Sequence, residues 1–358
     1  MQVKEFISKV NKNEIDLVEN TKKILSEVKK LDGEYHFFNV ISEESALEQA
    51  KKVNKKGKLA GLVVSVKDCI CVKDVESKAG SRMLSGYKPV FDATIISKLR
   101  EEGAIIIGKT AQDVFGFGSF SVNVGLDMKI PLNPFDKARS CGGSSGGSGG
   151  ITQKASFPHI SLGESTGGSI EAPASFCGVI GFCPTYGRVS RYGLIDYGNS
   201  FDKIGPMARS MYDVALMLEI IAGYDPKDST SLDEPVEEYT KYVGKSIAGM
   251  KIGLIKDSIG EGVDESVKKA ILNAVEVLKE KGAVISEVEL PLNFEYGVST
   301  YYLLAMCEAS TNLAKLCGMR YGVHDKFEGS FNDYFSKVRS ENFNSEAKRR
   351  IIIGTFAR

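Results

Sequence analysis

The sequence lacks an excess of charge of either sign. Its 358 residues include 46 Lys and Arg and 46 Asp and Glu, so the formal net charge is zero. A chain without a general electrostatic field has little to attract nucleic acid or an anionic membrane. If a nucleic acid takes part in the function, we expect another protein to do most of the holding.

The sequence also lacks the marks of export and membrane insertion. No apolar run approaches the roughly 18 residues that a spanning helix needs, and the N-terminus is charged and amphipathic, unlike a signal peptide. We therefore expect a soluble, cytoplasmic protein that makes no membrane contact.

Cysteine and histidine are too sparse for several kinds of site. The seven cysteines are odd in number and lack the density of a disulfide framework, so we expect reduced thiols. Cys69 and Cys71 form C-x-C, but no second pair stands at zinc-finger spacing, and we expect no metal site. The only histidines are His36, His159 and His324, none in a distinctive setting, which disfavours a Ser-His-Asp triad.

What is present is a chain of ordinary hydrophobic content with alternating β and α patterns. Hydrophobic residues make up 42%, enough for a buried core. Short apolar runs suit buried strands, and the segments between them have helical spacing. We predict an α/β fold with a mixed central sheet covered by helices on both faces. The expected strands are 59–66, 104–107, 251–255 and 283–290, and the expected helices are 92–102, 211–223, 264–281 and 298–317.

We expect a single domain over residues 1–358. Residues 1–57 read as N-terminal helices interrupted at 39–42, residues 58–210 as the core, and residues 211–358 as the remainder. The last residues read like the interior of an element, which suggests that the chain is truncated there.

Two glycine and serine clusters stand out from the rest of the chain. Gly142 to Gly150 is rich enough in Gly and Ser to suit a flexible linker. A second cluster at Gly167, Gly168 and Ser169 argues against that, because linkers seldom repeat inside a well-patterned region. Since glycine lets backbone amides approach a ligand closely, the two clusters favour an oxyanion or anion cradle.

Two literal motif matches have the wrong context. Residues 103–110 fit the pattern of a phosphate-binding loop, but the residues between its glycines read as a strand, which argues against nucleotide binding. Residues 143–147 fit G-x-S-x-G around Ser145, but a turn-forming segment precedes them where a nucleophile elbow needs a strand. Lys67, just after an expected strand, suits a lysine that extends to water.

Three blocks of the chain together resemble the amidase signature family. They are Val64 to Asp68 around Lys67, Gly142 to Ser148, and Ser165 to Ile170. The resemblance continues through residues 173–178, 184–190 and 202–206. The last of these blocks look specifically like the A subunits of glutamyl/aspartyl-tRNA amidotransferases, and residues 308–313, 320–322, 348–350 and 354–355 agree with that.

The resemblance implies a Ser-cisSer-Lys triad. Ser169 would be the nucleophile, Ser144 the bridging serine entered through a cis peptide bond, and Lys67 the base, with Ser145 as a second choice for the bridge. Such a base must lose its proton readily, which requires burial without a fixed carboxylate partner. The amides of Thr166, Gly167, Gly168 and Ser169 would form the oxyanion hole.

The resemblance also implies a substrate, partners and rivals. Glutamine would be hydrolysed and its ammonia passed to a B subunit that uses ATP and Mg²⁺ to amidate Glu-tRNA(Gln) or Asp-tRNA(Asn). A small C subunit would complete a heterotrimer. Tyr301 or Tyr302 and Arg349 or Arg350 would face the substrate. The alternatives are a stand-alone amidase and a catalytically degenerate scaffold subunit.

This chain departs from the family pattern beside the expected nucleophile. Ser165 replaces an acid and Glu171 replaces an arginine. A compensated pair, an altered site and weakened activity are three possible consequences.

Overall fold

The computed structural model describes all 358 residues, which form two compact units. The first comprises Met1–Thr240 with Ala305–Arg358, and the second comprises Lys241–Leu304. The sequence led us to expect one domain, whereas the residues group into two units.

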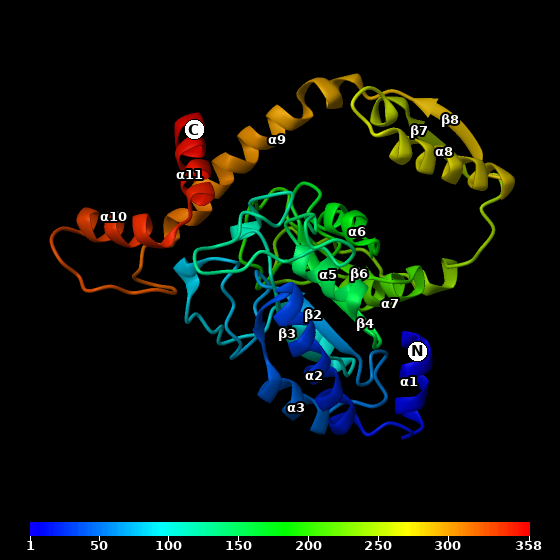
Figure 1. Ribbon diagram of the computed structural model, residues 1–358, viewed down its shortest axis with the longest axis horizontal. Coiled ribbons are helices and arrows are strands. Elements are labelled where there is room, and N and C mark those ends of the chain that lie inside the picture. Colours follow the sequence, from blue (N-terminus) through cyan, green and yellow to red (C-terminus); the bar gives the residue numbers. More distant parts are fainter. The chain divides into compact units, whose positions relative to one another are not determined.

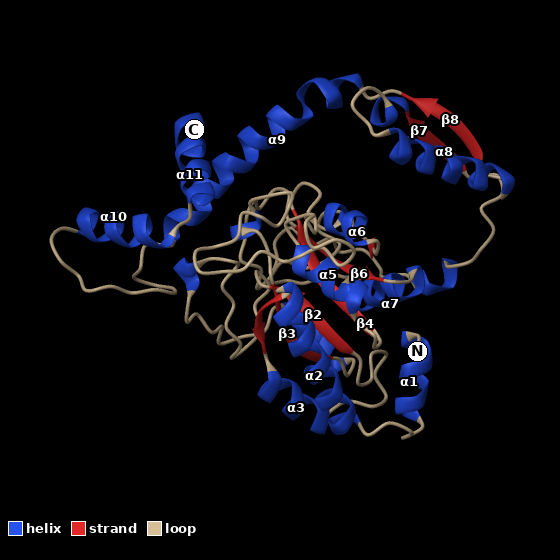
Figure 2. Cartoon of the chain, in the orientation of Figure 1, coloured by secondary structure: helices blue, strands red, loops and turns tan.

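The larger unit contains a six-stranded sheet and most of the helices (Figures 1 and 2). Its strands are β1 Phe38–Ile41, β2 Val63–Lys67, β3 Ile105–Thr110, β4 His159–Ser165, β5 Ile180–Gly181 and β6 Lys203–Ala208. Its helices are α1 Val3–Asn11, α2 Leu17–Tyr35, α3 Glu43–Lys51, α4 Thr94–Glu101, α5 Gly146–Lys154, α6 Glu171–Cys177, α7 Met211–Ile221, α10 Phe331–Asn342 and α11 Ser345–Ala357.

The sheet is mixed, with strand order β1-β3-β2-β4-β6-β5. Strand β2 runs parallel to both β3 and β4, with Val63 opposite Ile105 and His159. The other neighbours, β1 on β3, β6 on β4 and β5 on β6, are antiparallel. Since parallel strands end at the same edge of a sheet, the residues that follow β2 and β4 lie side by side.

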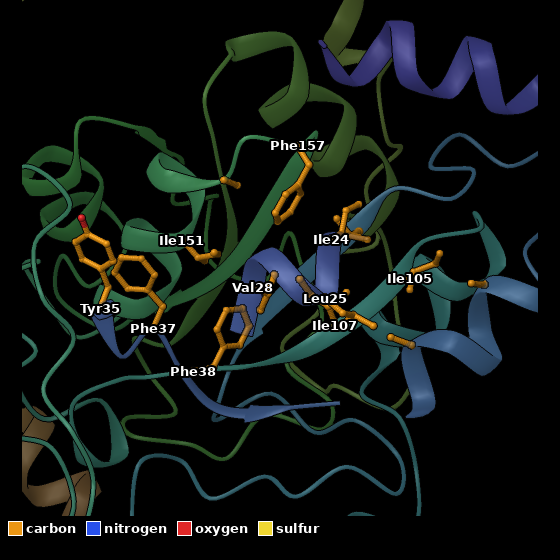
Figure 3. Close-up of a cluster of buried hydrophobic side chains, with 14 of the residues drawn as sticks. Ile24, Leu25, Val28, Tyr35, Phe37, Phe38, Ile105, Ile107, Ile151 and Phe157 are labelled. Carbon is orange, nitrogen blue, oxygen red and sulfur yellow. The ribbon is translucent and has the colours of Figure 1, made fainter. Parts of the chain in front are cut away.

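Helices cover the sheet and close an apolar core against it. One cluster of buried side chains joins α2 to β1, β3 and α5 (Figure 3). It contains Val28 of α2, Phe37 just before β1, Ile107 of β3 and Ile151 of α5. Both Val28 and Phe37 are fully buried. The α/β architecture predicted from the sequence is confirmed.

The first Gly/Ser cluster is buried and from Gly146 on is helical, so the linker interpretation is wrong. Residues 141–152 are buried throughout, and Gly146–Lys154 forms α5. Its glycines allow close packing: a Cβ on Gly147 would collide with the Phe37 carbonyl, and one on Gly150 with the Phe37 ring. Tertiary contact therefore overrides the poor intrinsic helix propensity of glycine.

The phosphate-loop match is a strand, as its sequence context indicated. Lys109 lies in β3 and is fully buried. Its ammonium donates to the carbonyls of Asp68 and Ile70 and, at 2.7 Å, to Ser77 Oγ. Lys109 therefore ties the segment after β2 to the sheet.

Other predicted elements differ at their ends. The break expected at residues 39–42 is largely β1, and the helix expected from Val298 to Cys317 is α9 Pro291–Asn312. Strand β2 begins at Val63 and not at Leu59, because residues 59–62 turn before the sheet. No helix has both the length and the apolar character to cross a membrane.

The second unit is a βαβ arrangement. Strands β7 Lys251–Ile255 and β8 Val284–Val288 are parallel, and α8 Glu265–Glu280 connects them. The side chain of Asp264 caps α8 by accepting from Ser266 N at 2.8 Å. The strand, helix and cap predicted from the sequence are confirmed.

Candidate active site

Lys67 is the last residue of β2, and its side chain is fully buried. Its ammonium nitrogen lies 2.7 Å from Ser144 Oγ, 2.8 Å from the Glu164 carbonyl oxygen and 2.7 Å from Glu164 Oε2. The interpretation of Lys67 as a lysine that extends to water is therefore wrong. The expectation that it has no fixed carboxylate partner is also wrong, because the parallel pairing of β2 with β4 places Glu164 beside it.

Ser144 follows a cis peptide bond after Gly143, as the resemblance implied. It is fully buried, and its carbonyl accepts from Asp113 N at 3.2 Å. Its neighbour Ser145 instead bonds the Glu164 carbonyl at 3.1 Å. Only Ser144, of these two serines, hydrogen-bonds Lys67.

Ser169 lies in the turn between β4 and α6 and is 6% exposed. Its carbonyl accepts from Ser145 N at 3.2 Å, which joins the two glycine and serine clusters through the backbone. The hydroxyls of Ser144 and Ser169 are not hydrogen-bonded to each other in this structure. The three expected triad residues therefore share one region, with Lys67 and Ser144 in direct contact.

The turn expected to form the oxyanion hole is built around a positive φ. Gly168 has a φ of 110°, which residues with a side chain rarely adopt, and nothing lies within 4 Å of where its Cβ would be. Its amide donates to Ser165 Oγ at 3.1 Å. Thr166 and Gly167 precede it in the same turn. To bind an oxyanion, the amide of Gly168 must give up its hydrogen bond to Ser165 and donate to the oxyanion.

Ser165 and Glu171, the two residues that depart from the family pattern, are hydrogen-bonded to each other. The hydroxyl of Ser165 donates to Glu171 Oε2 at 3.0 Å, and the amide of Ile170 donates to the same oxygen at 3.2 Å. This is the arrangement that a compensated pair predicts. Glu171 also lies in the first turn of α6, where a negative charge is favourable.

A second carboxyl group, that of Asp202, lies behind Glu164. The family resemblance includes Asp202 in residues 202–206 but gave it no role. Thr166 Oγ1 is 2.9 Å from Glu164 Oε1 and 2.8 Å from Asp202 Oδ1. All three residues are at least 95% buried. Burial, and next the charge of Glu164, raise the pKa of Asp202 to about 8. An acidic residue in a strand carries no sequence signal that it will face a lysine on a neighbouring strand.

Another buried acid supports the backbone at Ser144. Asp113 accepts from Ser121 N at 2.9 Å and from Asn123 N at 2.8 Å. Burial raises the pKa of Asp113 to about 6, although these hydrogen bonds favour its charged form. Asp113 therefore fixes the loop beside the cis bond by its side chain and by its amide.

The residues expected to bind substrate fall into two groups. Arg350, on α11, is 3% exposed, binds Glu346 Oε1 at 2.6 Å and donates to the Tyr197 hydroxyl. Arg349 is exposed and binds the same glutamate. Tyr301 and Tyr302 belong to the second unit, where their rings meet edge to face. Of these residues, only the two arginines lie in the unit that holds the triad.

The histidines have local partners away from the triad. His159 is buried, its Nε2 lies 3.0 Å from Ser65 Oγ, and burial lowers its pKa to about 3. His36 and His324 bond backbone carbonyls. No group of three or more His, Cys, Asp or Glu side chains is placed to hold a metal ion.

Comparison with known proteins identifies the family. The family described as Amidase matches residues 19–358. The A subunit of glutamyl-tRNA(Gln) amidotransferase from Staphylococcus haemolyticus is 42% identical, over 99% of this chain and 74% of that protein. The solved structure of the Thermotoga maritima protein of that name is 32% identical, with a TM-score of 0.76. The match covers 99% of this chain and 70% of that one. The solved structure of native peptide amidase from Stenotrophomonas maltophilia is 26% identical, with a TM-score of 0.84. The match covers 99% of this chain and 75% of that one. The chain belongs to the amidase family.

Proposed function

We propose that this chain is the glutamine-hydrolysing subunit of a tRNA-dependent amidotransferase. One observation carries the proposal: the buried 2.7 Å hydrogen bond between Lys67 and Ser144, beside the turn that contains Ser169. It occurs in a chain that is 42% identical, along nearly its whole length, to an amidotransferase A subunit.

The residues suit acyl transfer through a serine. Neutral Lys67 takes a proton from Ser144 Oγ, and Ser144 takes one from Ser169 Oγ. The Ser169 oxygen then bonds to the amide carbon of glutamine. As the C–N bond breaks, the proton returns through Ser144 to the leaving nitrogen and ammonia departs. Water then hydrolyses the glutamyl ester on Ser169.

The turn before Ser169 serves the developing negative charge. Backbone amides from Thr166 to Ser169 would bind the oxyanion, and a donor of this kind is commonly worth about 3 kcal/mol. An arginine suits the substrate's carboxylate because its guanidinium binds a carboxylate with two hydrogen bonds. Arg350 or Arg349 takes this role in the proposal, and Tyr301 or Tyr302 faces the amino end.

The remaining chemistry belongs to partners. A B subunit receives the ammonia and uses ATP and Mg²⁺ to activate glutamate or aspartate attached to tRNA, and a small C subunit completes the cytoplasmic complex. This chain needs no cofactor of its own in that scheme. Its zero net charge suits a subunit that leaves tRNA binding to another protein.

A glutaminase assay tests the assembly. We expect ammonia release from glutamine to rise when B and C subunits and charged tRNA are added, and to vanish in Ser169→Ala. Co-purification with B and C subunits should accompany this result. Activity that is indifferent to the partners would contradict the proposal.

A stand-alone amidase is the second candidate, favoured by the likeness to a peptide amidase. Turnover of simple amides that is the same with and without the partner subunits would select it. A degenerate scaffold subunit is the third, favoured by the carboxylate that pairs with Lys67. A serine-reactive amidase probe that labels the wild type, but not Ser169→Ala, would eliminate the scaffold.

A further inference from the structure

The surroundings of Lys67 suit a protonated lysine, because a carboxylate oxygen and two further oxygens lie around its nitrogen. An ammonium group has three hydrogens to donate. Three acceptors surround Nζ: Ser144 Oγ, the Glu164 carbonyl and Glu164 Oε2, at 2.7 to 2.8 Å. To act as a base, Lys67 must instead accept a hydrogen bond from Ser144 through a lone pair. The catalytic form differs from this arrangement by one proton.

The carboxylate of Glu164 is held in place from behind. Thr166 Oγ1 lies 2.9 Å from its other oxygen, Oε1, and 2.8 Å from Asp202 Oδ1. A hydroxyl has one hydrogen, so Thr166 can donate to only one of these two carboxyl groups. The other group must donate to Thr166 and must therefore carry a proton.

Asp202 is the protonated member of this pair. Its Oδ2 accepts from the amide of Tyr197 at 2.8 Å, and the amide of Gly198 is shared between Oδ2, at 3.0 Å, and Oδ1, at 3.1 Å. Oδ2 is therefore the better supplied acceptor, and Oδ1, which faces Thr166, carries the hydrogen. Burial raises the pKa of Asp202 to about 8, which agrees with this assignment. The hydrogen bonds then run from Asp202 to Thr166 to Glu164, and Glu164 is the ionised carboxylate that faces Lys67.

Other charged and titratable groups surround this chain of contacts. They are Asp68 and Cys69 after β2, Lys109 in β3, Asp113 in the loop after β3, Lys203 at the start of β6, Glu308 on α9 and Arg350 on α11. None of them hydrogen-bonds Lys67 Nζ. Glu164 is therefore the charge in direct contact with the expected base.

We propose that Glu164 holds Lys67 as its ammonium and thereby sets the lowest pH at which Ser169 can be acylated. This inference rests on the proposed role of Lys67 as base. Before each acylation, the ammonium gives one proton to solvent hydroxide and becomes an amine, and water is formed. Ser144 then passes its proton to that amine and receives the proton of Ser169, as described above.

Removal of that proton from Lys67 is unfavourable because of the charge that it leaves on Glu164. Loss of the ammonium leaves the Glu164 carboxylate buried without a counter-charge, which is strongly unfavourable. The ion pair with Glu164 therefore opposes formation of the base form. Glu164 acts through Lys67 as a positioning residue and does not touch the substrate.

The test removes the negative charge of Glu164 and keeps the size of its side chain. In Glu164→Gln, the amide oxygen can still accept from Lys67, and the amide nitrogen can donate to Thr166. The rate of Ser169 labelling by a fluorophosphonate probe is measured from pH 5 to pH 10. We expect the rising limb of the profile to move to lower pH, with labelling at pH 7 increased tenfold or more.

Glu219→Gln is the matched control. Glu219 is also a largely buried glutamate that pairs with a lysine, Lys58, and accepts from a threonine, Thr240, but it shares no hydrogen bond with the triad. Its substitution should leave the profile unchanged. A gain of labelling in Glu164→Gln cannot come from unfolding, so misfolding does not imitate the expected result.

Two outcomes overturn the proposal. An unchanged profile in folded Glu164→Gln shows that the carboxylate does not control Lys67. A loss of labelling at every pH, with an unaltered melting temperature, shows that Glu164 instead assists the reaction, for example by taking the proton of Lys67.

A measurement on the wild type remains decisive if the variant does not fold. The ¹⁵N shift of Lys67 Nζ in lysine-labelled protein, assigned by Lys67→Arg, should be that of an ammonium at pH 7. An amine shift there refutes the proposal. If wild-type Ser169 is not labelled at any pH, the proposed function fails, while the ¹⁵N shift still tests the ion pair.

Discussion

The buried proton on Asp202 makes the stability of this protein depend on pH in an unusual direction. Burial, and next the charge of Glu164, raise the pKa of Asp202 from its ordinary value of 3.8 to about 8, so we expect Asp202 to bind its proton more tightly in the folded chain. Between those two values the folded state holds more protons than the unfolded state. Stability contributed by this group is therefore lost as the pH rises.

The size of the effect follows from the two values. Each pH unit in this range lowers the free energy of unfolding by about 1.4 kcal/mol, so the loss from pH 5 to pH 8 is about 4 kcal/mol. Asp202→Asn mimics the protonated acid: its amide nitrogen can donate to Thr166 and its oxygen can accept from Tyr197 and Gly198. The variant has no proton to lose.

Urea denaturation at pH 5, 6, 7 and 8 measures the difference between Asp202→Asn and the wild type. We expect this difference to grow in favour of the variant by about 4 kcal/mol over that range. Comparing variant with wild type cancels the titration of other groups. Asp333→Asn is the control. Hydrogen bonds from Ser330 lower the pKa of exposed Asp333, so the effect of this substitution on the free energy of unfolding should change only below pH 5. A difference that changes by less than about 1 kcal/mol refutes the assignment of the proton to Asp202.

Three further predictions concern the triad, the core and the buried lysine of β3. Ser144→Ala should abolish labelling of Ser169 by the probe and Ser145→Ala should retain it, since only Ser144 contacts Lys67; the reverse order would select Ser145 as the bridge. Phe37→Ala should lower the free energy of unfolding by about 3–5 kcal/mol in urea titrations, because it empties a fully buried site; a loss under about 1 kcal/mol would mean that the cluster collapses around it. Lys109→Met should lower the melting temperature, because it removes the donor for two carbonyls and a hydroxyl. Neither the wild type nor this variant should bind ATP, and ATP binding by the wild type that Lys109→Met abolishes would restore the phosphate-loop interpretation.

Patterns within single segments predicted much of this fold. The βαβ arrangement around α8 follows from apolar periodicity and a capping aspartate, and both signals are local. Helix α5 escaped prediction because its first residues are glycine and serine, and what stabilises it is contact with Phe37, more than 100 positions earlier. Strand β1 escaped because its four residues are too few to show alternation.

Some residues of the candidate site could likewise be predicted from the sequence, and others could not. Lys67, Ser144 and Ser169 stand in motifs whose residues are adjacent in sequence, and the family resemblance picked them out. Glu164 and Asp202 meet only because β4 lies between β2 and β6, which places one acid against Lys67 and the other within reach of a shared threonine. No pattern along the chain records that proximity.

Glu164 supplies two acceptors to Lys67, one from its side chain and one from its backbone carbonyl. Any residue at this position keeps the carbonyl, so the fold alone goes on directing the lysine toward Ser144. Under the proposal for Glu164, substitutions at position 164 change the working pH while the expected base, Lys67, stays in place. Such a position gives evolution, or a protein engineer, a way to retune the chemistry without rebuilding the site.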